Sequence, residues 1–364
     1  MLQLSIIMPL YNEEKNLSHG IESFLSQSIS SDCELICIDD GSSDSTVNLI
    51  ESYSHMGNIR LLKQNHQGSG EARNLGIKAA KGIYIGFLDA DDEYPSPYTL
   101  EHLISAANET DESIVGGSLE SVYVHEDGTE SKTNVSRLYI FPRNEKIMYE
   151  DYQVDFAYQR FIFSAQLIRS HNIEFPRLVR YQDPPFFVRC MIASQSFFAL
   201  KEPTYHYRLD KGKVSWNFDK ISDLLDGIIE VATLASENNL RNLFHLTQSR
   251  LVDYWKSVIL PYSLDFGDFE VIEKALCAHG KMCKLASQMK PPATKSPFSI
   301  ELSNNVRAIL DNSNLRESLQ ATSKKLEKAD EALDKIKRSN SWKIGRAFTA
   351  APRAIKRFLR ESSR

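Results

Sequence analysis

Short apolar runs alternate with segments of helical spacing over the first hundred residues. The run Leu4–Met8, which ends at Pro9, has the composition of a buried strand, and Leu17–Leu25 repeats apolar residues every three or four positions. Strands that alternate with helices are typical of an α/β fold with a doubly wound, mostly parallel sheet. Ligands of such sheets bind beyond the carboxyl ends of the strands. Further strands are expected at Glu34–Ile38, Ile59–Leu62 and Ile83–Leu88, and further helices at Thr46–Tyr53 and Glu71–Ala80.

The pattern changes after the first hundred residues. A strand is expected at Ser113–Ser118, and mixed segments follow at Ser121–Val124 and Leu138–Phe141. Helical spacing then returns and continues towards residue 290. The sequence predicts an α/β domain at 1–218, a helical subdomain at 219–290, a linker at 291–300, a helical or coiled-coil segment at 301–338 and a basic amphipathic tail at 339–364.

Apolar residues in the segment 301–338 follow 4-3 spacing over three heptads. This spacing is typical of a coiled coil, through which two copies of the chain would form a homo-oligomer. It is equally typical of one helix lying on the body of the protein. Both interpretations stay open, because Thr322 and Ala329 weaken the apolar seam.

Composition places the chain among soluble globular proteins. Of its 364 residues 42% are hydrophobic and 25% are charged, which excludes wholesale disorder and a bundle of membrane helices. No stretch approaches the ~20 unbroken apolar residues of a membrane-spanning helix, and the first residues lack the basic segment of a signal peptide. The five cysteines lack paired metal-binding spacing, and the strand-like setting of Cys33 and Cys37 predicts that these two are buried thiols. The expected location is therefore the cytoplasm.

Charge is unevenly distributed along the chain. Residues 335–364 contain ten Lys or Arg and one acid, so this tail carries +9 and the rest carries −14 of the total of −5. An acidic body argues against nucleic acid as a partner. The tail combines basic residues with an apolar stripe that includes Trp342 and Phe348, which is typical of a helix lying on an anionic membrane surface. The alternatives are a disordered tail and a tail packed on the acidic body.

The strongest candidate for chemistry is Asp89-Ala90-Asp91-Asp92, at the end of the fourth expected strand. Three carboxylates in four residues repel one another, and a hard divalent cation that also binds phosphate oxygens would remove this repulsion. A turn or a helix start also favours aspartate, and is the structural alternative. The position at the end of a parallel strand favours a metal site.

Two further clusters follow the second and third expected strands. Ile38–Asp44 contains Asp40, which could accept hydrogen bonds from a base or a ribose, and which could equally shape a turn. Asn65–Asn74 places Arg73 in the first turns of a helix beside a glycine loop, an arrangement that suits nucleotide recognition. Tyr11, after the first strand, could stack on a planar base.

These clusters resemble the motifs of the family 2 glycosyltransferases with the GT-A fold. The resemblance rests on Met8-Pro9-Leu10-Tyr11-Asn12-Glu13, Asp39–Thr46, Gly70-Glu71-Ala72-Arg73-Asn74 and Asp89-Ala90-Asp91-Asp92, and it covers about residues 1–215. It implies a mixed, mostly parallel sheet followed by helices. It also implies a donor site in which Asp89 reaches ribose and Asp91 ligates Mg²⁺ or Mn²⁺ on the diphosphate. The other donor-binding residues that it implies are Pro9, Tyr11, Glu13, Asp40, Asn65, Arg73 and Ala90, most of them around uridine.

The same resemblance implies an acid that activates the acceptor, about ninety residues after the aspartate cluster. Asp183 lies there, although this chain has Gln182 where many relatives have Glu. Asp183 is therefore the candidate general base, while Pro184 behind it also suits a residue that caps a helix. Arg208 or His206 could neutralise the leaving diphosphate, with core packing of the neighbouring tyrosines as the alternative.

The function that the resemblance implies is inverting, metal-dependent transfer of a sugar from a UDP-sugar to a hydroxyl of a glycan, lipid-linked or cell-envelope polymer acceptor. A catalytically degenerate protein that binds nucleotide sugars as a scaffold is the alternative. A nucleotidyltransferase is disfavoured, because no glycine-rich, Lys-containing loop follows the first strand. A processive synthase is disfavoured too, since a Gln-x-x-Arg-Trp motif is absent from the sequence.

Overall fold

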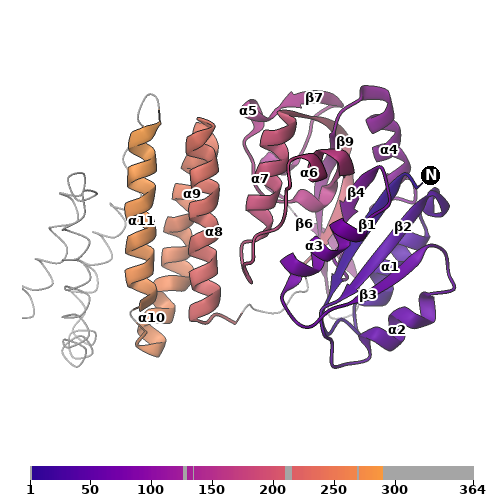
Figure 1. Cartoon of the computed structure of the whole chain (residues 1–364), viewed down its shortest axis with the longest axis horizontal. Helices are drawn as coiled ribbons and strands as arrows, with labels where there is room; N and C mark the ends of the chain where they lie inside the picture. The colour runs from indigo at the N-terminus through magenta and orange to yellow at the C-terminus, as the bar shows by residue number, and fades with distance from the viewer. Residues whose placement is uncertain (1, 126–128, 134, 210–214, 269, 290–364) are drawn as a thin grey trace, which may run out of the picture. The chain divides into compact units, whose positions relative to one another are not determined.

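The computed structural model describes residues 2–125, 129–133, 135–209, 215–268 and 270–289. The expected linker, heptad segment and basic tail, at 291–300, 301–338 and 339–364, lie outside these residues. The chain divides into two units, Met1–Val214 and Ser215–Arg364, and each is described by itself (Figure 1).

The first unit is built on one nine-stranded sheet within the described residues. Its strand order is β3-β2-β1-β4-β8-β5-β9-β7, and β6 pairs with β5 outside this path. The strands are β1 Leu4–Leu10, β2 Cys33–Asp39, β3 Ile59–Lys63, β4 Tyr84–Phe87, β5 Ile114–Val124, β6 Glu130–Thr133, β7 Glu145–Met148, β8 Phe161–Ser164 and β9 Ser196–Arg208. Its helices are α1 Leu17–Leu25, α2 Thr46–Tyr53, α3 Ser69–Ala79, α4 Thr99–Thr110, α5 Tyr149–Tyr152, α6 Ala165–Ser170 and α7 Asp183–Ser194.

The sheet is parallel on one side and mixed on the other. Strands β3, β2, β1 and β4 pair in parallel, as the alternation of strands and helices predicts. Strand β8 then pairs antiparallel with both β4 and β5, whereas β5 and β9 are parallel. The carboxyl ends of β1, β2 and β4 therefore meet at one edge, where the polar clusters of the sequence begin.

Strand β1 does not end at Pro9, contrary to the expectation from the sequence. Pro9 pairs with Ile38 and the strand continues to Leu10. The pairing of β1 with β4 has already stopped at Ile7 and Phe87, so the missing N–H of Pro9 interrupts no ladder on that side.

Strand β5 is longer than the sequence predicts. It runs without a break from Ile114 to Val124 because it pairs with β9 over nearly this whole length, with register shifts at Gly117, Ser118 and Leu119. The N–H of Gly117 donates to the Thr204 hydroxyl at 2.9 Å. A Cβ on Gly117 would lie 2.4 Å from the backbone oxygen of Glu202, so this glycine belongs to a close strand contact rather than to a strand end.

Alternate residues of the strands face two separate cores. Leu4, Ile6 and Met8 of β1 pack in one cluster with apolar residues of α1, α2 and α4. On the opposite face α3 packs on β1 and β2, and a group of aromatic rings covers β4 and β8. The rings of Phe175 and Phe186 stack there, with centroids 3.9 Å apart. Burial on both faces explains why the central strands are almost continuously apolar.

Two cysteines of β2 confirm the expectation of buried thiols. Cys33 and Cys37 are fully buried, and burial raises the pKa of each thiol to about 12. Neither side chain is therefore a reactive thiolate at neutral pH.

The described part of the second unit is helical. Its helices are α8 Phe218–Glu237, α9 Arg241–Tyr254, α10 Leu260–Phe266 and α11 Glu270–Gln288, and a short π-helix, Trp255–Ile259, connects α9 to α10. Helices α9 and α11 both pack against α8 (Figure 1). Among the described residues of the whole chain, no helix has the length and apolar character needed to cross a membrane.

Candidate active site

The turn after β4 carries three aspartates with different surroundings. Asp92 is fully buried; its carboxylate accepts hydrogen bonds from the Tyr205 hydroxyl at 2.9 Å and from the backbone N–H of Arg208 at 2.9 Å. The backbone N–H of Asp89 donates to the same Tyr205 hydroxyl. Residues of β9 thus anchor the turn through hydrogen bonds to Asp92 and Asp89. The side chains of Asp89 and Asp91 are half-buried. Tyr205 itself is 1% exposed, so it serves both as a core residue and as an anchor of the turn.

Arg73 joins the turn after β4 to the start of α7. One terminal nitrogen of its guanidinium lies 2.8 Å from Asp89 Oδ1, and the other lies 3.2 Å from Asp183 Oδ1. The Arg73 side chain is only 5% exposed. Burial alone would lower the pKa of Arg73, but Tyr158, Asp183 and Asp89 outweigh this effect and raise it. The guanidinium is therefore a permanent positive charge between two carboxylates.

Asp183 is the first residue of α7 and is not its N-cap. The preceding residue, Gln182, is the N-cap, and Pro184 and Pro185 occupy the next positions of the first turn. An acid in the first turn is stabilised by the helix dipole. The Asp183 side chain is 28% exposed, so its carboxylate is accessible to a bound molecule while it contacts Arg73.

The loop after β3 is organised around Asp40. Its carboxylate accepts hydrogen bonds from the backbone N–H groups of Gln67 and Gly68, both at 2.8 Å, and from the Gln64 amide at 2.7 Å. His66 Nδ1 lies 2.9 Å from the same carboxylate. Gly68 has φ +95°, a conformation that favours glycine, just before α3 begins. In this structure Asp40 shapes the loop that leads into α3.

Tyr11 lies on the surface beside that loop. Its ring is 46% exposed and stacks on the imidazole of His66, with centroids 4.1 Å apart. The turn after β1, which includes Tyr11, is fixed by Asn12. This residue has φ +56°, and its side-chain oxygen accepts a hydrogen bond from the backbone N–H of Ser43 at 2.8 Å. Asn65 is exposed on the same loop as His66.

The remaining donor-site candidates lie close to these turns. Pro9 is in β1, and the backbone N–H of Glu13 donates to the Thr46 hydroxyl at 2.8 Å. Ala90 is 3% exposed; a Cβ added to Gly20 of α1 would lie 3.0 Å from its carbonyl oxygen. Helix α1 therefore approaches the aspartate turn closely.

Two residues of a short 3-10 turn at Tyr158–Arg160 also belong to the site, although the sequence analysis did not identify them. The Gln159 amide donates to Asp89 Oδ2 at 3.2 Å. The Arg73 guanidinium lies 5.6 Å from the centroid of the buried Tyr158 ring. The turn follows Ala157, which has φ +64°. No periodicity or charge cluster marks this segment, so nothing in the sequence indicates that it reaches Asp89.

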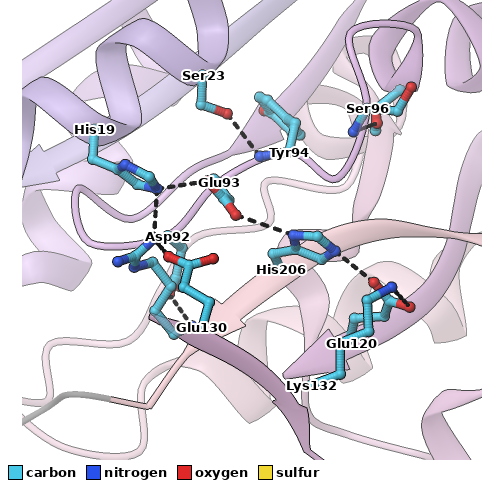
Figure 2. Close-up of polar contacts among 12 residues, drawn as sticks. His19, Ser23, Asp92, Glu93, Tyr94, Ser96, Glu120, Glu130, Lys132 and His206 are labelled. Atoms are coloured by element: carbon cyan, nitrogen blue, oxygen red, sulfur yellow. Dashed lines mark hydrogen bonds and ion pairs between the residues drawn. The ribbon is translucent and has the colours of Figure 1, made fainter. Parts of the chain in front are cut away.

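Charged residues form a network of contacts beside the aspartate turn (Figure 2). His206 lies between two carboxylates, with Nδ1 3.1 Å from Glu93 and Nε2 2.5 Å from Glu120. Glu93 also contacts His19 Nε2 at 2.6 Å, and Lys132 contacts Glu120 at 2.8 Å. Hydrogen bonds from His19 and His206 lower the pKa of Glu93 strongly. Burial alone would lower the pKa of His206, but Glu93 and Glu120 outweigh it and raise that pKa.

The guanidinium of Arg208 contacts residues of this charged network. One of its nitrogens lies 2.6 Å from Glu130 and 2.9 Å from His19 Nε2. That imidazole nitrogen donates its hydrogen to Glu93, so it cannot also accept a hydrogen bond from Arg208. The hydrogen-bond partner of this Arg208 nitrogen is therefore Glu130. Its side chain is 13% exposed, so a phosphate would have to replace Glu130 to reach it.

The residues around Asp91 fit a metal that binds together with a diphosphate. Among the described residues, no group of three or more His, Cys, Asp or Glu side chains is arranged to hold a metal ion by itself. Mg²⁺ typically binds through one or two carboxylates, phosphate oxygens and water, and not in a cage made only of protein groups. The half-buried carboxylate of Asp91, two residues after Asp89, is a ligand of this kind and would hold the metal there.

The protein has a mixed α/β sheet, and Asp89, Arg73 and Asp183 lie together at one edge of it. This is the architecture of a GT-A-type protein. The comparisons agree: the model of glycosyl transferase family 2 matches residues 5–167. An uncharacterised glycosyltransferase of Haemophilus influenzae is 30% identical over 221 residues, which are 59% of this chain and 82% of that protein. The chain belongs to glycosyl transferase family 2.

Two other relatives extend the comparison. The putative glycosyltransferase EpsH of Bacillus subtilis is 28% identical over 224 residues, which are 60% of this chain and 64% of EpsH. The chain thus matches less than two thirds of the length of EpsH. A crystal structure of Staphylococcus aureus TarS residues 1–349, in complex with UDP-GlcNAc, superimposes with a TM-score of 0.63 at 17% identity, and covers 79% of this chain and 84% of that one. This last likeness shows the fold.

Proposed function

We propose that this protein is an inverting, metal-dependent glycosyltransferase that moves a sugar from a UDP-sugar to a hydroxyl of a cell-envelope polymer. The observation that carries the proposal is the pair of contacts from Arg73 to Asp89 and to Asp183. They bring an acid of the donor-binding motif and the candidate base to one guanidinium. A scaffold protein without catalysis would have no need to keep an accessible carboxylate there.

In the proposed reaction Asp183 takes the proton from an acceptor hydroxyl. The acceptor oxygen forms a bond to the anomeric carbon, and the bond from that carbon to the diphosphate oxygen breaks, with its electron pair leaving on UDP. The attack from the opposite face inverts the configuration. A general base of this kind contributes ~10²–10⁴ in rate. Mg²⁺ or Mn²⁺ held by Asp91 would neutralise charge on the leaving diphosphate.

The donor is proposed to lie over the turns after β1, β2 and β4. The exposed ring of Tyr11 already stacks on one planar ring, that of His66, and a uracil ring could take its place. UDP is favoured because UDP-GlcNAc is the ligand named for the TarS structure. The donor-binding residues proposed from the motifs are Pro9, Tyr11, Glu13, Asp40, Asn65, Asp89 and Ala90, with Arg208 on the diphosphate if it exchanges Glu130 for phosphate.

The acceptor is proposed to be a polymer of the cell envelope. TarS is named a poly(ribitol-phosphate) β-N-acetylglucosaminyltransferase, and it is 25% identical to this chain over 215 residues.

The +9 tail, which lies outside the described residues, would hold the enzyme peripherally on an anionic membrane surface where such polymers are made. Flotation with anionic liposomes tests this part: a truncation at Ser339 should no longer float, and equal flotation would refute it.

A panel of sugar nucleotides tests the donor and the metal together. Melting temperatures are measured with UDP-, GDP- and dTDP-sugars, with and without Mn²⁺, because a ligand at 100 times its Kd stabilises the folded state by about 2.7 kcal/mol. We expect the largest rise with a UDP-sugar and Mn²⁺, and loss of the Mn²⁺ effect in Asp91→Asn. If no sugar nucleotide raises the melting temperature, the protein is not a glycosyltransferase of this kind.

A further inference from the structure

The first two turns of α3 contact one segment of chain a hundred residues later. Asn74 makes two hydrogen bonds with the backbone of Phe175: its amide donates to the carbonyl oxygen at 2.9 Å, and its side-chain oxygen accepts from the N–H at 2.8 Å. The Gln182 amide donates to the Ser69 hydroxyl at 2.8 Å. A Cβ on Gly70 would lie 3.2 Å from the carbonyl oxygen of Pro176.

The segment that α3 contacts ends at the proposed base. Glu71 pairs with Arg177 at 3.2 Å, and Arg73 pairs with Asp183 at 3.2 Å. The motif Gly70-Glu71-Ala72-Arg73-Asn74 therefore contacts residues 175–183 through its glycine, its acid, its arginine and its asparagine. We call this contact the α3 dock. Its hydrogen bonds to Phe175 are buried, which makes them costly to break.

Arg73 is placed to act inside the protein rather than on its surface. Its side chain is 5% exposed and its guanidinium lies 5.6 and 5.5 Å from the centroids of the Tyr158 and Phe175 rings. Both terminal nitrogens are directed at carboxylates, Asp89 and Asp183. A residue that bound a nucleotide base would have to present donors to the pocket, whereas these donors already have protein partners.

We propose that Arg73 is a positioning residue that orients Asp183, so that its loss lowers the turnover number far more than it lowers donor affinity. This inference rests on the proposed function, and it gives the α3 dock its purpose. It differs from the role in uridine binding that the sequence resemblance assigns to Arg73. An orienting contact matters because a misplacement of about 1 Å at the reacting groups can cost ~10²-fold in rate.

The test compares Arg73→Gln and Arg73→Lys with the wild-type chain. Turnover is measured as the rate of UDP release. The donor is UDP-GlcNAc at first, and then the UDP-sugar that raises the melting temperature most. Each reaction is run with poly(ribitol phosphate) as acceptor and with water alone. Affinity is measured as the Kd of UDP with Mn²⁺ by calorimetry. We expect Arg73→Gln to lower kcat about 100-fold with Kd changed less than threefold, and Arg73→Lys to recover part of kcat. A tenfold higher Kd with unchanged kcat would overturn the inference.

A double-mutant comparison separates positioning from a general loss of structure. If Arg73 acts through Asp183, Arg73→Gln lowers turnover no further in the Asp183→Asn background. Additive losses would overturn the inference. Arg143→Gln is the matched control, since the Arg143 side chain is 76% exposed and pairs with Glu145 at 2.8 Å.

Hydrogen exchange keeps the inference testable if Arg73→Gln has no measurable turnover. Exchange should quicken in residues 175–183 and stay unchanged in the loop around Asp40. Unchanged exchange in 175–183 would show that Arg73 does not hold this segment. Failure of the proposed function itself is recognised separately, because the wild-type chain would then neither bind UDP nor release it.

Discussion

At the scale of residues, the surroundings of each carboxylate decide what it can do. Asp92 has hydrogen bonds from Tyr205 and from the backbone of Arg208, which leaves it as an anchor of the turn. Asp89 has one oxygen on Arg73 and the other on Gln159. Protein groups therefore provide hydrogen-bond partners for the carboxylates of both Asp89 and Asp92.

His206 gives a prediction that depends on pH. Its two ring nitrogens both face carboxylates, and only the protonated ring can donate to both. The pKa of His206 is raised in the folded state, so its stabilising effect is complete below its unfolded value of about 6.5 and is lost as pH rises through the folded value. The neighbours Glu93 and Glu120 have lowered pKa values, which keeps both ionised in this range.

We expect His206→Gln to lower the free energy of unfolding by about 1–2 kcal/mol near pH 6 and by less near pH 8.5, because the lost hydrogen bonds are made to charged groups. Thermal melts across this pH range measure the difference in stability. The neighbouring charged residues Lys132, His19 and Arg208 are kept as in the wild-type chain. His102→Gln is the control, since the pair of His102 with Glu202 is nearly half exposed and should matter little. An equal effect at both pH values would contradict the assignment of a protonated ring.

The sequence reveals some site residues and not others, for physical reasons. Asp89, Asp91 and Arg73 occur in dense local motifs, so the place of the two aspartates at a strand end and of Arg73 early in a helix could be predicted. The contact of Gln159 with Asp89 could not, because it depends on a turn that Ala157 enters at φ +64° and that carries no charge or apolar pattern. The partners that hold Asp40 and Tyr11 in the structure also come from loop geometry, which no sequence pattern encodes.

At the scale of elements, a glycine of α3, Gly76, sets how closely this helix packs on the sheet. A Cβ on Gly76 would lie 2.5 Å from Ile7 Cγ2 and 3.0 Å from Ile38 Cδ1. The helix can approach β1 and β2 this closely only without a side chain there. Because the α3 dock lies one to two turns earlier on the same helix, this packing also sets the position of Arg73.

Gly76→Ala is therefore expected to destabilise the fold. Alanine favours a helix by ~1 kcal/mol over glycine, but overpacking typically costs 1–3 kcal/mol, so we expect a net loss of about 1 kcal/mol. Gly280→Ala in α11 is the matched control: nothing lies within 4 Å of its added Cβ, and only the helix gain should remain. Urea denaturation measures both. A Gly76→Ala chain as stable as the Gly280→Ala chain would contradict the close packing.

Helices and strands could be predicted where one pattern holds over a whole element. The helix Thr46–Tyr53 is observed with the expected bounds, and the first four strands differ from expectation by one or two residues at their ends. The long strand β5 could not be predicted, because its glycines at the close contact with β9 look like a strand end. Pairing between distant strands, rather than local preference, makes it continuous.

At the scale of the whole molecule, the site depends on both sides of the sheet. Strands β1, β2 and β4 supply the parallel edge, whose order follows from the alternation in the sequence. Strand β9 supplies the anchors of the aspartate turn, and α7 begins with Asp183. These later elements come from the mixed half of the sheet, so their arrangement could not be derived from periodicity and depended on the family resemblance.

The transfer rate of Asp183→Asn is the measurement that tests the proposed reaction most directly. The substitution keeps the size of the side chain and its place at the start of α7, but removes the carboxylate that would accept the proton. We predict that UDP release in the presence of acceptor falls by ~10²–10⁴-fold, while the Kd of UDP with Mn²⁺ stays within threefold of the wild-type value. Turnover equal to that of the wild-type chain would show that Asp183 is not the base.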